Sequence, residues 1–325
     1  MKATTLIPLS ATLLLAAACG GTEATGSSTS STSAGSGGST GSGGGATTAT
    51  TTTSGGGGED AGEVVTLTLS SFTVPPGGEV YKCQNFKNPF KGADAEITRF
   101  ESHMTKGSHH MLLFYKKTVK EDGPLDDCSG LEFAATPYST QLPDDELSFP
   151  EGVAGLLSPD RGLRVQSHYL NVTEQPIEAH VEVKLHLAKP GTVTDHAGIL
   201  FVVEPAIDIA PNSMGVVQHD CGIPYDMNLI KATSHMHKHG TSFSSTIGGE
   251  KIFDTNTWDD PKPVTFEPGK PVKANAPLHF ECHFTNNSAE TLTFGESAQN
   301  NEMCIFVAAF YPIPPGGLTT VDCHN

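Results

Sequence analysis

The sequence predicts an all-β protein with two antiparallel, jelly-roll-like β-sandwich domains in tandem. Apolar and polar residues alternate with the period of a β-strand in several segments, most clearly in 65–69 and 177–187. Clusters of glycine and proline separate such segments, at 75–78, 121–124 and 314–317. No segment of the sequence carries a convincing helical stripe. Many short strands joined by Gly/Pro turns are typical of antiparallel sandwiches.

Residues 1–19 have the pattern of a lipoprotein signal peptide. An apolar run over 6–18 is too short to span a bilayer as a mature helix, and it ends in small residues before Cys19. We therefore expect Cys19 to be the site of lipidation. Signals of this kind more often carry leucine three residues before the cysteine, whereas Leu15 stands four before it. The alternative is an ordinary signal peptide cut near Ala18.

The next segment, residues 20–62, consists almost entirely of Gly, Ser, Thr and Ala and has no apolar periodicity. Such a composition cannot bury enough surface to offset the entropy of ordering, so we expect a disordered linker. A lipidated Cys19 followed by this linker predicts an exported protein that is anchored to the cell envelope, at the outer-membrane or periplasmic face or at the cell surface.

The rest of the chain is expected to form two domains, 63–204 and 205–325, with a break near Glu204-Pro205. Besides the two alternating segments, the expected strands are 111–115, 198–203, 278–284, 292–294 and 304–311.

The chain has a net charge of −17 and no basic cluster, which argues against nucleic acid as a partner. No second apolar run is long enough to cross a membrane. We expect a monomer that acts on a small molecule and contacts the membrane through its lipid anchor.

Seven cysteines are present, and six remain if Cys19 carries the lipid. An even number in an exported chain favours three disulfides, although the sequence does not choose among the possible pairings. No two cysteines form a CxxC pair, so a thiolate zinc site is disfavoured. If all six are bridged, no thiolate remains to bind a metal.

Three clusters stand out among the fourteen histidines. The first is His109-His110. Adjacent residues of a regular strand point to opposite faces, so joint metal binding requires a bulge at the start of this strand, which Gly107 permits. The second is His168, which shares a face with Gln166; a lone strand histidine is usually structural.

The third cluster is His235-Met236-His237, followed by His239. On a strand, His235 and His237 would project to the same face about 6–7 Å apart at the backbone, which suits two imidazoles on one metal ion. His239 is either a third ligand or a supporting group. The remaining eight histidines show no ligand pattern. Met303, taken alone, would be a core residue.

Together these residues resemble the copper type II, ascorbate-dependent monooxygenases, the family of peptidylglycine hydroxylating and dopamine β-monooxygenases. The resemblance covers roughly 63–325 and lies in the order and spacing of four motifs. These are His109-His110-Met111-Leu112-Leu113-Phe114, Gln166-Ser167-His168-Tyr169, His235-Met236-His237 and Glu302-Met303-Cys304.

The resemblance implies two copper ions per chain. One is bound by His109, His110 and His168, with Gln166 and Tyr81 as supporting residues. The other, at which the chemistry takes place, is bound by His235, His237 and Met303. The thioether makes the second site the softer one, which favours Cu(I).

The resemblance also implies the disulfides Cys83–Cys128, Cys221–Cys323 and Cys282–Cys304. A further disulfide of the family is missing, because Lys116 stands where one of its cysteines would be expected.

The implied reaction is the hydroxylation of a substrate C–H bond with dioxygen, while the second oxygen atom leaves as water. Ascorbate or another one-electron donor reduces both copper ions, and the all-histidine copper supplies an electron across a gap between the domains. Thr233, Ile305 and Val307 stand where peptide-acting members clamp a terminal carboxylate, and they cannot form that clamp. The sequence therefore predicts a less polar substrate than a peptidylglycine.

Two other functions remain open: a copper-binding or copper-relay envelope lipoprotein without oxygenase turnover, and a structural or adhesive envelope protein. A blue-copper electron carrier is disfavoured because that site needs a free cysteine thiolate. A zinc hydrolase is disfavoured because the sequence has no HExxH motif.

Overall fold

The computed structural model describes residues 50–52, 62–90, 93–132 and 134–323. The expected signal peptide, Cys19 and most of the expected linker lie outside these ranges. The described residues belong to one compact unit. The described residues are all-β, as predicted, and contain no helix, so no helix among them can cross a membrane.

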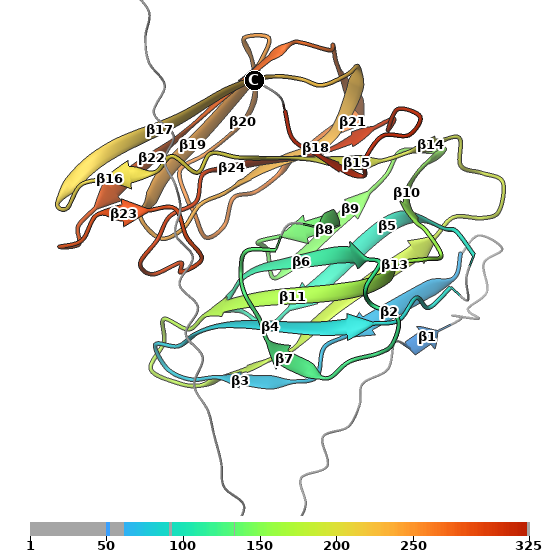
Figure 1. Cartoon of the computed structure of the whole chain (residues 1–325), viewed down its shortest axis with the longest axis horizontal. Helices are drawn as coiled ribbons and strands as arrows, with labels where there is room; N and C mark the ends of the chain where they lie inside the picture. The colour runs from blue at the N-terminus through green and yellow to red at the C-terminus, as the bar shows by residue number, and fades with distance from the viewer. Residues whose placement is uncertain (1–49, 53–61, 91–92, 133, 324–325) are drawn as a thin grey trace, which may run out of the picture. The chain divides into compact units, whose positions relative to one another are not determined.

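The strands that precede residue 198 form two larger sheets and one small one (Figure 1). The seven-stranded sheet contains, in spatial order, β1 (Thr50–Thr52), β2 (Val64–Thr68), β13 (Val181–Leu187), β5 (Ala95–Met104), β10 (Val153–Leu157) and β14 (Asp195–His196), with β9 (Asp144–Ser148) paired to β5. The five-stranded sheet has the order β7 (Leu125–Asp127), β4 (Glu79–Phe86), β11 (Gly162–Leu170), β6 (Ser108–Lys116) and β8 (Ala135–Thr140). The small sheet pairs β12 (Ile177–Ala179) with β3 (Phe72–Val74).

The later strands form a second group of sheets. A five-stranded sheet has the order β21 (Val264–Val272), β18 (Met227–His235), β24 (Ile305–Tyr311), β15 (Gly198–Val203) and β25 (Thr320–Val321). A four-stranded sheet has the order β17 (Ser213–Gly222), β22 (Pro277–Asn286), β19 (Gly240–Ile247) and β20 (Glu250–Thr255). A small sheet pairs β16 (Asp208–Ile209) with β23 (Leu292–Thr293).

Two placements differ from the sequence expectations. Thr50–Thr52, inside the expected linker, pairs antiparallel with β2. β15 precedes the expected break at Glu204-Pro205, yet it pairs with β24 and β25 of the second group. The apolar run 198–203 therefore joins the second group of sheets.

β24 connects the two buried clusters of the molecule. Alternate residues of a strand point to opposite faces. Ile305, Val307 and Ala309 belong to the apolar cluster of the first group of sheets. Phe306, Ala308 and Phe310 pack in the cluster of the second group. Burial on both faces explains why this strand is almost entirely apolar.

Three disulfides are formed among the described residues, and they are the pairs that the resemblance implied: Cys83–Cys128, Cys221–Cys323 and Cys282–Cys304. Disulfides of this number are typical of proteins exported from the cytoplasm.

Candidate metal centre

The first histidine group forms around a β-bulge at the start of β6. In the pairing of β6 with β11, His110 lies opposite His168 and Ser108 lies opposite Tyr169, so His109 is the extra residue. Gly107, directly before this strand, has a φ of 99°, which favours glycine. The bulge lets the adjacent side chains of His109 and His110 gather with that of His168, with ligand atoms within 4.8 Å of one another.

Tyr81 and Gln166 both contact this group. Tyr81 lies opposite His168 on β4 and stacks on its ring, with centroids 3.8 Å apart. The Tyr81 hydroxyl donates to the carbonyl of Glu296 (2.6 Å), and a Cβ at Gly130 would lie 2.5 Å from the Tyr81 ring. Gln166 is fully buried and donates through Nε2 to the carbonyl of Ser129 (2.8 Å). Tyr81 therefore fixes the plane of the His168 ring.

The second histidine group lies at the end of β18. His235 is the last residue of that strand, and His237 lies two residues beyond it, so the two residues do not share a strand face as the sequence analysis assumed. Their ring centroids are 5.2 Å apart. The chain turns after the strand because the side-chain oxygens of the buried Glu302 accept from the amides of His237 (3.0 Å) and His239 (2.7 Å).

The two groups are adjacent. The ring of His109 lies 4.9 Å from that of His235 and 5.2 Å from that of His237. His109, His235 and His237 also have ligand atoms within 4.8 Å of one another, so His109 belongs to both groups. The two histidine groups are not separated by a gap, because the bulge of β6 that carries His109 packs directly against the end of β18.

Burial keeps these imidazoles neutral, and a neutral imidazole has a lone pair for a metal ion. Desolvation, followed by the neighbouring imidazoles, lowers the pKa of His109 and of His110 well below the usual value. Burial lowers the pKa of His235 in the same way and that of His237 to about 4. Burial also lowers the pKa of His168, against the opposing effect of Glu79.

Three of the rings have one nitrogen bound to a protein acceptor. His168 Nε2 lies 2.9 Å from Glu79, and hydrogen bonds outweigh the effect of burial to lower the pKa of Glu79 to about 2. The carboxylate is therefore an acceptor, and Nε2 donates. His237 donates through Nδ1 to the carbonyl of Asn301 (3.1 Å).

Gln141 is the hydrogen-bond acceptor for one ring nitrogen of His235. Its Nε2 donates to the carbonyl of Ser234 (2.7 Å), so its Oε1 accepts from His235 Nδ1 (2.6 Å). The opposite ring nitrogens, Nδ1 of His168 and Nε2 of His235 and of His237, have no hydrogen-bond partner, nor has either nitrogen of His109 and His110. Buried imidazole nitrogens without partners are the arrangement that a metal ion would complete.

Met303 lies close to the second group. It is buried, follows Glu302, and lines a partly open cavity of about 90 Å³ together with His235 and His110. The three positions that the sequence analysis singled out for substrate binding, Thr233, Ile305 and Val307, line the same cavity.

Other histidines are arranged differently. His239 Nε2 lies 3.3 Å from the carbonyl of Gln299, and His239 is not in either ligand group. His219 lies near Cys221 and Cys323, but these cysteines are bridged to each other and offer no thiolate. Among the described residues, the five clustered histidines therefore remain the best candidates for metal ligands.

Several residues that contact the centre carry little signal in the sequence that marks them. Glu79 and Gln141 orient His168 and His235. Trp258, the one tryptophan of the chain, places its ring 5.4 Å from that of His109. None of these lies in a motif, and their distance along the chain from the ligands hides the contact. An isolated tryptophan in a chain rich in histidine is the one signal that could have been followed.

No model of a known protein family matches the chain. The chain is 24% identical to the mouse (Mus musculus) protein named DBH-like monooxygenase protein 2 over an alignment of 294 residues, which covers 76% of this chain and 45% of that protein. It thus spans less than half the length of this relative.

Two solved structures are similar at low TM-scores. The STIV MCP has a TM-score of 0.35 and 8% identity, and covers 78% of this chain and 98% of that chain. The major capsid protein P2 from bacteriophage PM2 has a TM-score of 0.30 and 8% identity, with coverages of 78% and 100%. At these scores we draw no conclusion from either about this chain.

Proposed function

We propose that this chain is a copper-dependent monooxygenase that hydroxylates a C–H bond of a small organic substrate. The observation that carries the proposal is the cluster of five buried imidazoles with unpartnered ring nitrogens beside a cavity that Met303 lines. The similarity to a mouse protein named as a DBH-like monooxygenase supports the same class.

The donor set fits copper. Imidazole suits both Cu(I) and Cu(II), and a thioether favours Cu(I). In the proposed assignment His109, His110 and His168 hold one ion, and His235, His237 and Met303 hold the other. Bound copper supplies one-electron chemistry with dioxygen. The overall reaction consumes the substrate R–H, one dioxygen, two electrons from ascorbate or another one-electron donor and two protons, and it yields R–OH and water.

The protein's own residues prepare this site in two ways. Burial excludes water from the imidazoles and keeps them neutral. Glu79, Gln141 and the carbonyl of Asn301 each hold one ring in the tautomer that turns a lone pair towards the metal position.

Met303→Leu tests the proposal. Leucine has a similar volume but no sulfur, so we expect the ascorbate-driven, copper-dependent oxygen uptake to fall at least ~100-fold, because the copper ligand and its Cu(I) preference are lost. The all-histidine site should keep its copper, measured by metal analysis and by EPR. Met214→Leu is the matched control, because Met214 is exposed on β17. Unchanged oxygen uptake in Met303→Leu would exclude the assigned role.

A copper relay without oxygenase turnover is the second candidate. It is favoured by the position of His109 in both ligand groups, because adjacent ligand groups would let a copper ion pass from one to the other. Metal analysis of the purified chain, combined with an oxygen-uptake assay, distinguishes the two functions. Two copper ions per chain with oxygen uptake support the monooxygenase, two without uptake on a broad substrate panel support the relay, and one ion contradicts the two-site assignment.

We further propose that the two groups of sheets are tandem β-sandwiches. The separate buried clusters support this, and the pairing of β15 with β24 moves the proposed boundary from Glu204-Pro205 to the segment between β14 and β15. We propose that the chain is a monomer held to the cell envelope by lipidated Cys19.

A further inference from the structure

The floor of the cavity beside His235 is one face of the sheet formed by β15, β24 and β18. The strand register places the side chains of this face in rows across the three strands. From the metal-binding end, the rows are Val203–Ile305–His235, Phe201–Val307–Thr233 and Ile199–Ala309–Lys231. Successive rows are two residues apart, so the three rows extend over about 13 Å.

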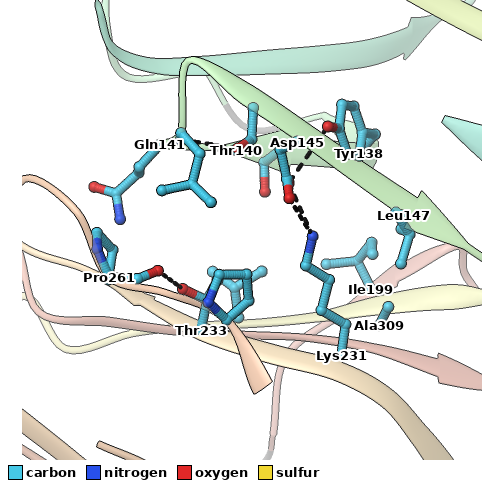
Figure 2. Close-up of a pocket in the computed structure, with 14 residues that line it drawn as sticks. Tyr138, Thr140, Gln141, Asp145, Leu147, Ile199, Lys231, Thr233, Pro261 and Ala309 are labelled. Carbon is cyan, nitrogen blue, oxygen red and sulfur yellow. Dashed lines mark hydrogen bonds and ion pairs between the residues drawn. The ribbon is translucent and has the colours of Figure 1, made fainter. Parts of the chain in front are cut away.

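The first two rows line the cavity that contains His235 and Met303. The third row lines a second cavity, of about 40 Å³. Gln141, Thr233 and Val307 line both cavities, so the two adjoin. Figure 2 shows the second cavity. The Thr233 hydroxyl donates a hydrogen bond to the carbonyl of Pro261, and the Lys231 ammonium group donates to the Asp145 carboxylate.

Every charged side chain that lines the two cavities among the described residues already has an opposite charge beside it. In the first cavity, Glu132 is paired with Lys116 and with Arg164 Nε (3.2 Å). In the second, Lys231 Nζ donates to both carboxylate oxygens of Asp145 (2.7 and 2.9 Å) and to the carbonyl of Glu146 (2.7 Å).

Apart from a bound metal ion, the cavities therefore have no spare charge with which to bind an ionised ligand. The three hydrogens of the Lys231 ammonium group are all used. The amide of Gln141 is also occupied at both ends, by Ser234 and His235. An ionised ligand would lose its hydration here without gaining a partner.

We propose that these adjoining cavities bind an elongated, uncharged apolar substrate, an alkyl chain or an alkyl-substituted aromatic ring, that lies along the floor with one end at His235 and Met303. This inference rests on the proposed monooxygenase function and adds the class of substrate. The two cavities, of about 90 and about 40 Å³, are together smaller than the apolar cavity of ~150 Å³ that holds benzene, so they admit a slender chain or ring that extends into their open mouths and exclude a bulky molecule. Val307, in the middle row, is the residue that sets the preference for uncharged ligands.

Three probes with the same ring and chain test the preference: propylbenzene, 3-phenylpropionate and 3-phenylpropylamine. Binding is measured by calorimetry on the full chain, as purified and after copper loading, without a reductant. We expect propylbenzene to bind at least about tenfold more tightly than either charged probe, because only the charged probes lose hydration without compensation. Equal or tighter binding of a charged probe would overturn the inference.

Two substitutions locate the binding. Val307→Arg should reverse the preference, so that 3-phenylpropionate binds more tightly than propylbenzene. Val307→Phe fills the middle row without a charge and should weaken propylbenzene at least ~10-fold by steric exclusion. Val216→Arg is the control, because Val216 is exposed on β17 and lines neither cavity, and it should change nothing. Propylbenzene binding that survives Val307→Phe in a folded protein would contradict the proposed location.

Failure of this inference can be told apart from failure of the proposed function. Tight binding of propylbenzene without any oxygen uptake contradicts the monooxygenase proposal and leaves the binding site intact. Oxygen uptake that only charged substrates stimulate supports the monooxygenase and contradicts the apolar substrate class.

Discussion

Three of the five clustered imidazoles have one ring nitrogen bound to a protein group from a distant part of the chain. His168 is separated from Glu79 by 89 residues, His235 from Gln141 by 94 and His237 from Asn301 by 64. These acceptors fix which ring nitrogen is protonated, and so they fix which nitrogen faces its neighbours. His109 and His110 have no such partner, and their placement depends on the bulge at the start of β6.

Gln141→Met should weaken metal binding at one group only. Methionine has a similar size but cannot accept from His235 Nδ1, so the ring is no longer held in its tautomer. We expect the copper affinity of the His235/His237/Met303 set to fall about 10–100-fold, as is usual for the loss of a partner of a metal-binding histidine. Titration against a copper chelator measures it.

The all-histidine set is the internal reference in this test, because its copper affinity should stay the same in Gln141→Met. Gln218→Met is the matched control, since Gln218 is an exposed glutamine that contacts Glu281 on the surface of β17 and β22. An equal loss of affinity at both sets would show that Gln141 supports the fold and does not position His235.

The candidate ligands could be predicted from motifs, whereas their hydrogen-bond partners could not. The order and spacing of motifs that resemble those of the copper monooxygenases singled out the five histidines, and the structure does bring these histidines together. Glu79 and Gln141 could not be found this way, because each is an ordinary polar residue of a strand or a turn until the fold places it beside a ring. The adjacency of His109 to His235 was hidden for the same reason.

Strand β24 illustrates what periodicity can and cannot predict. Its apolar run predicted a strand at 304–311, and the structure has one at Ile305–Tyr311. Alternation could not assign its faces, because both are buried. The end of β18 shows the opposite case. The spacing of the histidines predicts a strand that continues through His237. In the structure, Glu302, from a distant segment, ends the strand by accepting from the amides beyond it.

Two of the disulfides should differ in how much they stabilise the folded protein. Cys282–Cys304 spans 22 residues and Cys221–Cys323 spans 102. In the chain-entropy account, replacing both cysteines by alanine should lower the free energy of unfolding by roughly 3 kcal/mol for the first pair and roughly 5 kcal/mol for the second. Urea denaturation of the metal-free protein measures both values.

For copper binding we expect the opposite ranking, so that loss of the shorter-span disulfide has the larger effect. Cys304 directly follows Met303, so loss of the Cys282–Cys304 bridge frees the segment that carries the proposed thioether ligand. Loss of Cys221–Cys323 should leave copper binding unchanged, because neither cysteine adjoins a proposed ligand. If removing Cys221–Cys323 weakened copper binding more than removing Cys282–Cys304, the proposed role of the segment at Met303 would be wrong.

At the scale of the whole molecule, the two groups of sheets are joined by polar contacts around an apolar surface. The largely buried Lys231–Asp145 pair links β18 to β9. Glu79 on β4 accepts from Ser297 (2.7 Å) and from the amide of Ala298 (2.5 Å), and so ties the first group of sheets to the turn before Met303. The histidine cluster lies within this junction, because His109 belongs to one group of sheets and His235 to the other.

Copper should therefore stabilise the described unit as a whole and not one group of sheets alone. Each site held at a free copper concentration of 100 times its dissociation constant adds about 2.7 kcal/mol to the free energy of unfolding. Because His109 lies among ligands from both groups, we expect scanning calorimetry to show that all unfolding shifts to higher temperature with copper, in one transition. His109→Ala should reduce the shift for the whole unit, whereas His279→Ala, which removes a partly exposed histidine paired with Asp220, should not. A copper-induced shift confined to one of two separate transitions would mean that the metal sites form independently within each group of sheets.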